Sequence, residues 1–183
     1  LSPLIEDGEL NGKVVVGSPD KHGPDQVRAR DGYLAGELSM KLGGYASTEE
    51  DVIALDTEVV RDSMFDTSLL LLGGVLTNTV MKKFNQEFAV SFSGESFPYH
   101  EIQTPKSSFT DENIGIIAKT ENPENPESSI YAVAGIRNTG TRAAVKAFKN
   151  LEDLVEGYRG GEFYAVVRGL YMDGEFLVEL LHY

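Results

Sequence analysis

Three glycine-ended apolar segments are the places in this sequence where ligand chemistry would be expected. Residues 14–17, 69–74 and 131–135 each end in glycine and are each followed by a helical pattern. The free N–H groups at the start of a helix attract phosphate and carboxylate groups. None of the three turns carries the GxGxxG or GK[ST] spacing of a nucleotide site, so we expect the glycines to serve tight turns.

Binding at these turns remains the alternative interpretation. In open α/β sheets, ligands bind at the carboxyl ends of the strands, where the strand order reverses. If the second and third segments lie side by side, five residues would line such a site: Gly73, Gly74, Asn78, Thr139 and Thr141.

Catalytic side chains are sparse. His22, His100 and His182 show no i, i+4 pairing of a helical metal site, and no GxSxG nucleophile motif occurs. Asp56 and Glu58 would share one face of a strand predicted over residues 52–60. A pair of carboxylates needs an apolar pocket to separate their pKa values, so we expect these two to be solvated.

Acidic side chains at two turns offer oxygen ligands that suit Ca²⁺. Asp173 and Glu175 form one group, and Glu121, Glu124 and Glu127 surround an Asn-Pro loop. Neither group has EF-hand spacing, and Asp-Gly is ordinary turn chemistry, so a solvated turn and a charged loop are favoured.

A polar cluster precedes the third helix, at residues 138–142. Thr139 or Thr141 is expected to cap that helix. Arg142 in the first helical turn opposes the helix dipole and indicates a salt bridge.

The elements that would position these residues follow from hydrophobic periodicity. Strands are predicted over residues 13–17, 52–60, 69–72, 89–92, 99–103, 114–120 and 130–135. Helices are predicted over residues 25–42, 77–88, 141–148 and 151–156, with Asp25 as the first N-cap. Residues 162–181 alternate around Asp173-Gly174, which predicts an antiparallel hairpin.

These elements predict an α/β fold with a largely parallel or mixed sheet, helices on both faces in Rossmann-like layers, and a C-terminal antiparallel hairpin. The 183 residues suit one domain over 1–183, and two lobes over 1–61 and 66–183 are the less favoured division.

Composition limits the partners. The chain has 29 acidic and 16 basic side chains, a formal net charge of −13, which repels nucleic acid and anionic lipid. We therefore expect no nucleic-acid partner and no direct membrane insertion. The chain has no cysteine, which excludes disulfides and thiolate chemistry. Residues 1–10 lack the pattern of a signal peptide, so we expect no targeting segment within this chain.

Three segments, taken in order, resemble the core of archaeal surface-layer (S-layer) proteins of the methanogen and Thermococcales type. They are SLLLLGGVLTNTVMKKFN, IGIIAKTENPENPESSIYAVAGIRNTGTRAAVKAF and YAVVRGLYMDGEFLVELL. The opening KVVVGSPDKHGPDQVRARDGYLAGELSMKLG is similar to the N-terminal βα unit of that family. The sequence departs from the family at Val75, where a proline usually follows the double glycine, and it has no Asn-x-Ser/Thr sequon.

The resemblance implies a non-enzymatic structural domain of the cell envelope, located at the cell surface, that associates with itself or with other envelope proteins. It implies no cofactor and no catalytic residues. With the acidic composition, it suggests assembly bridged by Ca²⁺. The competing hypothesis is an anion-binding, nucleotide-binding or enzymatic α/β domain that uses the glycine turns.

Overall fold

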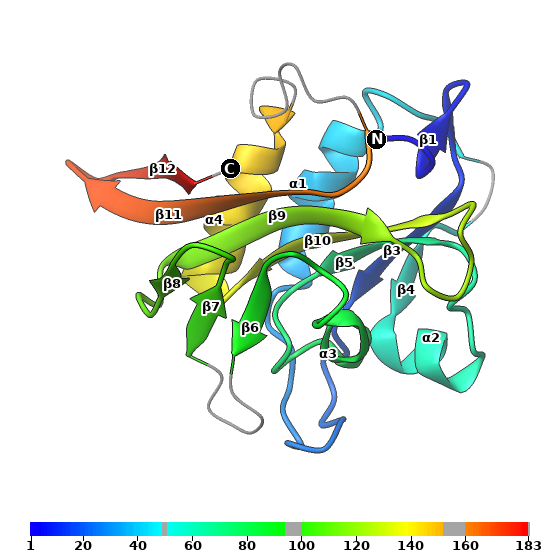
Figure 1. Ribbon diagram of the computed structural model, residues 1–183, viewed down its shortest axis with the longest axis horizontal. Coiled ribbons are helices and arrows are strands. Elements are labelled where there is room, and N and C mark those ends of the chain that lie inside the picture. The colour runs from blue at the N-terminus through cyan, green and yellow to red at the C-terminus, as the bar shows by residue number, and fades with distance from the viewer. Residues whose placement is uncertain (49–50, 94–99, 152–159, 183) are drawn as a thin grey trace.

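A computed structural model describes residues 1–48, 51–93, 100–151 and 160–182 of the chain. Its centre is a mixed sheet of seven strands in the order β12-β11-β9-β10-β5-β3-β4 (Figure 1). The bounds of these strands are Gly12–Val16 (β3), Ile53–Leu55 (β4), Ser68–Leu72 (β5), Ile114–Glu121 (β9), Ser129–Gly135 (β10), Phe163–Met172 (β11) and Glu175–His182 (β12).

The sheet has a parallel half and an antiparallel half. Strands β4, β3, β5 and β10 are parallel neighbours, whereas β10, β9, β11 and β12 pair antiparallel. Every residue of β5 and β10 is buried, as their unbroken apolar sequences require. The predicted mixed sheet and the C-terminal hairpin are confirmed. The less favoured division placed residues 1–61 and 66–183 in separate lobes. Strand β3 of the first range pairs directly with β5 of the second range, so both ranges contribute to one sheet.

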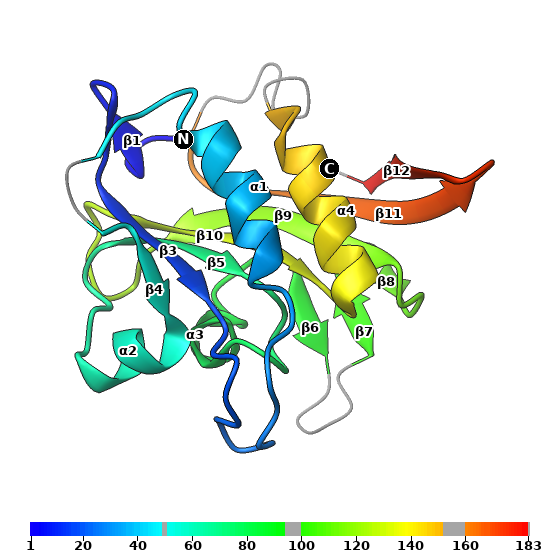
Figure 2. The ribbon, with the colours of Figure 1, turned by 180° about the vertical axis from the view of Figure 1, so that it is seen from behind.

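Two long helices lie together across one side of the sheet (Figure 2). Helix α1 spans Tyr33–Leu42 and helix α4 spans Asn138–Phe148. Their apolar side chains join the core cluster that contains Val14, Leu70 and Val133 of the sheet. Helix α4 can lie close to the strands because Gly140 meets the backbone at Ile114, where an added Cβ would collide with the carbonyl oxygen.

The alternate residues of the same strands belong to a second core cluster. This cluster includes Val59 of α2 (Asp56–Arg61), Phe84 of α3 (Thr79–Phe84) and Phe92 of β6 (Ser91–Ser93). Strand β6 forms a small antiparallel sheet with β7 (Glu101–Gln103) and β8 (Ser108–Phe109). A short hairpin of β1 (Ile5–Glu6) and β2 (Glu9–Leu10) precedes β3.

The strand predicted over residues 52–60 is wrong beyond Leu55. Strand β4 ends there and α2 begins at Asp56. Acidic side chains favour the first turn of a helix, and Glu58 Oε2 accepts a hydrogen bond from the backbone N–H of Leu55 at 2.9 Å. Asp56 is fully buried rather than solvated.

Helix boundaries also differ from the prediction. Helix α1 begins at Tyr33 rather than near Asp25, because residues 18–29 form a loop held by a bridge between His22 and Val27. Asp25 instead pairs with Lys82 of α3 at 3.2 Å. Helix α3 is shorter at both ends than residues 77–88. The helix predicted over residues 151–156 lies almost entirely outside the described residues.

Candidate functional site

The turns after β5 and β10 lie side by side, because these strands are parallel neighbours with Leu72 opposite Val133. Gly73 has a φ of +98°, which L side chains rarely adopt. A Cβ on Gly74 would lie 2.6 Å from the carbonyl oxygen of Gly135. The double glycine therefore allows a chain reversal and a close contact between the two turns.

Asn78 ties these turns to the helix that follows. Its side-chain oxygen accepts hydrogen bonds from the backbone N–H groups of Val80 and Met81 at 3.1 and 3.0 Å. Its amide nitrogen donates to the carbonyl oxygens of Val15 and Leu72, both at 3.1 Å. The side chain is completely buried, so both of its polar atoms serve the fold.

Thr139 and Thr141 lie within α4 and do not cap it. The N-cap is Arg137, whose side chain makes no capping hydrogen bond. The hydroxyl of Thr141 is buried and faces the carbonyl oxygen of Arg137 at 3.4 Å. Arg142 forms no salt bridge among the described contacts, and its guanidinium donates to the Tyr171 hydroxyl at 2.6 Å instead.

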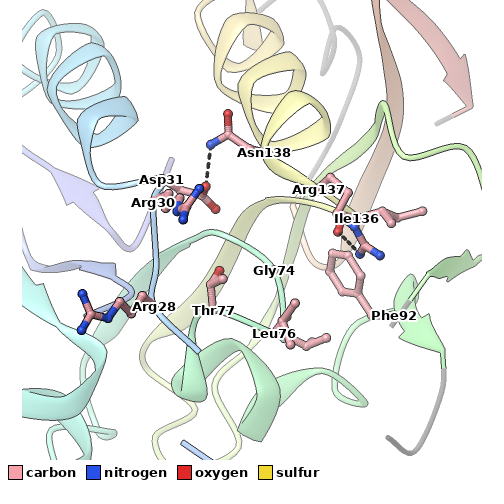
Figure 3. Close-up of a pocket in the computed structure, with 12 residues that line it drawn as sticks. Arg28, Arg30, Asp31, Gly74, Leu76, Thr77, Phe92, Ile136, Arg137 and Asn138 are labelled. Carbon is pink, nitrogen blue, oxygen red and sulfur yellow. Dashed lines mark hydrogen bonds between the residues drawn. The ribbon is translucent and has the colours of Figure 1, made fainter. Parts of the chain in front are cut away.

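A cavity of about 160 Å³ opens at these strand ends, and we call it the strand-end cavity. In Figure 3, Arg30 and Asp31 lie on one side of it and Phe92 and Arg137 on the other, with Gly74 between. The full lining is Arg28, Arg30, Asp31, Gly74, Val75, Leu76, Thr77, Phe92, Gly135, Ile136, Arg137 and Asn138. Apolar side chains therefore form much of the wall, and three arginines surround it.

The three arginines differ in the contacts that their side chains make with other groups. Arg137 donates to the carbonyl oxygen of Ile136 at 2.9 Å and lies 3.5 Å from a carboxylate oxygen of Glu112. Arg28 and Arg30 are exposed, and neither has an ion pair or hydrogen bond within the described part of the chain. The guanidinium of Arg28 points away from Gly74 (Figure 3). Two guanidinium groups at this rim are thus available to an anionic partner.

Asp31 is the buried acid of the cavity, with 8% of its surface exposed. Burial raises the pKa of Asp31, and hydrogen bonds from the side chains of Asn138 and Thr141 oppose that rise. The Asn138 amide donates to its Oδ1 at 2.6 Å. This carboxylate therefore links the segment before α1 to the first turn of α4.

A second buried acid, Asp56, lies at the end of β4 and was not predicted as a buried group. Its Oδ1 accepts from the backbone N–H groups of Ser18 and Thr57 at 2.8 and 2.9 Å. Its Oδ2 accepts from both the N–H and the hydroxyl of Thr79, each at 2.7 Å. His22 Nε2 completes the set at 2.9 Å from Oδ2. This carboxylate joins the ends of β3 and β4 to the start of α3.

This His-Asp-Thr group differs from a nucleophilic triad. In a triad, histidine stands between the acid and the nucleophile, so that it can take the proton of the hydroxyl. Here the carboxylate of Asp56 stands between His22 and Thr79. Histidine Nδ1 faces the carbonyl oxygen of Asp20 at 2.7 Å, so acceptors face both ring nitrogens. No ring nitrogen is left to act as a general base.

The cation candidates lie far apart in the fold. Asp173 and Glu175 flank the turn of the β11–β12 hairpin, whereas Glu121 ends β9 at the opposite end of the sheet. Glu124 pairs with Lys83 at 2.9 Å. Within the described residues, no group of three or more histidine, aspartate or glutamate side chains could hold a metal ion.

The Asn-Pro loop is shaped by its asparagines. The buried Asn122 amide donates to the carbonyl oxygens of Phe65 and Thr67 at 2.7 and 2.9 Å, and Asn125 donates to that of Asp66 at 2.7 Å. Their side-chain oxygens accept from the backbone N–H groups of Glu124 and Glu127. The loop therefore fixes the segment that leads into β5.

A larger hollow, of about 550 Å³, lies at the opposite ends of β3, β4 and β5. Its charged lining residues are Glu9 and Lys13, and the Lys13 amine donates to the carbonyl oxygen of Asp51 at 2.6 Å. Thr48 in its wall adjoins residues outside the description. The strand-end cavity is therefore the better-defined candidate.

No helix in the described ranges combines the length and apolar character needed to cross a bilayer. Neither a scan against protein-family models nor a search of curated proteins finds a match to this chain.

Proposed function

We propose that this chain is a non-enzymatic structural domain of an archaeal surface-layer-like protein of the cell envelope. It would act outside the cell, by association with further copies or with other envelope proteins. The resemblance of three ordered segments to that family supports this function. So does the use of the buried polar groups Asn78, Asp56 and His22 in internal hydrogen bonds.

The open edge of β12 is the observation that carries the proposal. This eight-residue strand ends the seven-stranded sheet, and among the described strands only β11 pairs with it. Leu177 and Leu180 are 39% and 41% exposed on it. A long edge with apolar side chains is a ready template for pairing with another chain.

A two-fold arrangement of two β12 strands fits this edge. Antiparallel pairing centred on Val178 places Phe176 opposite Leu180 of the second copy, on one face of the joined sheet. On the other face Leu177 stands opposite Glu179, whose charge is offset by Arg168 at 3.6 Å in its own copy. The joined sheet would gain cross-strand apolar pairs without placing equal charges directly opposite.

Charge shapes the conditions of assembly. Copies that each carry a formal net charge of −13 repel one another, so salt and divalent cations such as Ca²⁺ would promote association by screening. We propose that the domain binds no nucleic acid and does not insert directly into a membrane. Light scattering in Ca²⁺ and in chelator measures this effect, and an unchanged association state would count against it.

We also propose Rossmann-like layering for the domain, with helices on both faces of the sheet. Two core clusters formed by alternate residues of the same strands support this arrangement. It would leave the antiparallel half, which ends at β12, with an open edge for contact with other copies.

Sedimentation velocity across a concentration series tests the assembly function. Leu180→Lys should weaken association about ten-fold, because a charged group replaces an apolar contact. Leu177→Lys is the matched control, because in the proposed register the new amine faces Glu179 and association should persist. Equal association of both variants and the parent chain would refute the β12 interface.

The strand-end cavity favours one competing function, a small-anion site within an α/β binding domain. Arg28 and Arg30 support it. The cavity volume of about 160 Å³ is well below the about 300–1,000 Å³ of pockets for larger ligands, which argues against a nucleotide. Calorimetric titration with phosphate and with a nucleoside triphosphate measures this binding directly.

A further inference from the structure

We propose that the strand-end cavity receives the hairpin tip of a second copy of this chain. The hairpin tip comprises residues 172–175, where β11 ends and β12 begins. Met172 would enter the cavity while Asp173 and Glu175 pair with Arg28 and Arg30 at its rim. This inference rests on the proposed assembly function, and it adds a contact distinct from the β12 edge.

The cavity has the size and chemistry to hold one apolar side chain. Val75 and Phe92 are buried in its wall, and Ile136 is 5% exposed. Methionine is unbranched and flexible, so it fills irregular apolar spaces well. The guanidinium groups of Arg28 and Arg30 lie outside this apolar part, where they would meet the carboxylates that flank the methionine.

A compact inorganic anion suits the cavity less well, because Asp31 already lies inside it. Burial of that carboxylate is costly, and a second negative charge beside it would raise the cost. An apolar side chain leaves the hydrogen bond between Asp31 and Asn138 undisturbed. The acidic groups of the incoming tip would stay at the rim, on the arginine side.

The hairpin tip is exposed and preorganised. Met172 is 55% exposed, and the carboxylates of Asp173 and Glu175 have no ion pair or hydrogen bond in the described part of the chain. Asp173 and Gly174 both have positive φ, +51° and +84°, as in the rigid two-residue turns of tight hairpins. Docking therefore requires little ordering of the backbone.

Charge complementarity favours a second copy as the occupant. Two copies with 29 acidic and 16 basic side chains each repel on average, so a stable contact must join an acidic patch to a basic one. The rim supplies two exposed arginines without a partner among the described residues, and the tip supplies two exposed carboxylates likewise without one.

The topology allows a reciprocal exchange. Strands β10 and β11 both run antiparallel to β9, so they point the same way. Val167 of β11 is level with Gly115 of β9, and Gly115 with Gly135, so residues 168–172 extend past the end of β10. Figures 1 and 2 show the hairpin projecting away from the starts of α1 and α4. Two copies related by a two-fold axis could each insert a tip into the other.

Two different two-fold contacts on one chain produce an extended array rather than a closed pair. The β12 edges would join copies in one direction, and the tips and cavities would join them in another. Such an array is what a surface layer requires.

A charge-swap experiment tests the docking. All proteins carry Leu180→Lys, so that the β12 contact is weakened equally in each of them and the differences between them report on the tip and the cavity. The cavity variant adds Arg28→Glu and Arg30→Glu. The tip variant adds Asp173→Asn, which suits the positive φ, and Glu175→Lys. The control adds Lys21→Glu and Lys106→Glu, which changes the net charge as the cavity variant does.

Sedimentation velocity at low salt should show association about ten-fold weaker in the cavity variant and in the tip variant than in the control. An equimolar mixture of the two should associate to within about three-fold of the Leu180→Lys parent, because the amine introduced by Glu175→Lys then meets the glutamates at the reversed rim. Met172→Ala should weaken association while Met172→Leu retains it.

Three results would overturn the proposal: a Leu180→Lys parent that stays monomeric at every concentration, single variants that associate like the control, or a mixture that is not restored. A separate measurement follows thermal unfolding in the presence of phosphate. Protection against thermal unfolding by phosphate, abolished in the cavity variant while the tip variant associates normally, would assign the cavity to a free anion instead.

Discussion

The imidazole of His22 lies with Nε2 2.9 Å from Oδ2 of Asp56, while its Nδ1 faces the backbone oxygen of Asp20. An oxygen atom therefore faces each ring nitrogen, and the imidazole is held on both sides. The pair closes the loop of residues 18–29 onto the starts of α2 and α3, which makes it a structural element of the fold.

Asp56→Asn is predicted to destabilise the protein strongly. The new amide nitrogen would face donors in place of an oxygen that now accepts hydrogen bonds, and a buried pair would be broken, at about 3–5 kcal/mol. Chemical denaturation gives the free energy of unfolding. Asp62→Asn, at an exposed pair with Arg61, is the control and should leave the midpoint unchanged. Equal midpoints for both variants would contradict the structural role of Asp56.

Asn78 should separate two contributions in one residue. Asn78→Ala loses the helix cap and leaves two buried carbonyl groups without their donor, at about 2–4 kcal/mol in all. Asn78→Asp restores the cap acceptor but not the donors to Val15 and Leu72, so it should recover only the cap share. If Asn78→Asp has the same denaturation midpoint as the parent chain, the hydrogen bonds that Asn78 donates to Val15 and Leu72 contribute nothing to stability.

Two helical glycines should respond in opposite directions to alanine. Gly36 in α1 is exposed with open space around it, so Gly36→Ala should stabilise the protein by about 0.5–1 kcal/mol. Gly140 in α4 meets the backbone of Ile114, so Gly140→Ala should destabilise by about 1–3 kcal/mol or more. Thermal unfolding measures both, and a stabilised Gly140→Ala variant would disprove the close packing of α4.

Asp31 should give a pH dependence of defined sign. Because its folded pKa lies above the ordinary value of 3.8, the folded state holds the proton more tightly than the unfolded state. The contribution of Asp31 is therefore fully present below that value, and is lost as pH rises through the folded pKa. Asp31→Asn should lack this decline. The free energy of unfolding of the variant should therefore rise relative to that of the parent chain as the pH increases from about pH 4. A difference that is flat with pH would contradict a raised pKa.

The sheet was largely predictable because its signals are local. Unbroken apolar runs identified β5 and β10, and Asp173-Gly174 between alternating segments identified the closing hairpin. Parallel neighbours then brought the turns at Gly74 and Gly135 together, as expected from adjacent strands.

The errors arose where distant contacts decide the structure. Residues 56–60 have the composition of a strand, yet Asp56 meets donors from Ser18 and Thr79 that no local pattern reveals. Helix α1 begins later in the chain than predicted, because His22 contacts the same carboxylate and holds the preceding segment as a loop. Tertiary hydrogen bonds overrode propensity in both cases.

The candidate site was identified only in part. Gly74 was named from the sequence, but Arg28 and Arg30 were not, because the loop that carries them is placed by tertiary contacts. The signal available in the sequence was that two arginines are separated by a single residue. The exposure of Met172 likewise depends on how far β11 extends past β10, which only the strand register determines.

The position of β12 at the boundary of the sheet has a further consequence for biosynthesis. Every other strand of the sheet precedes β12 in the chain, so the ribosome completes them first. The β12 edge and the hairpin tip, which we assign to contact between copies, are therefore completed after the residues of the strand-end cavity. Contact between nascent chains through β12 would have to wait until the whole sheet has been synthesised.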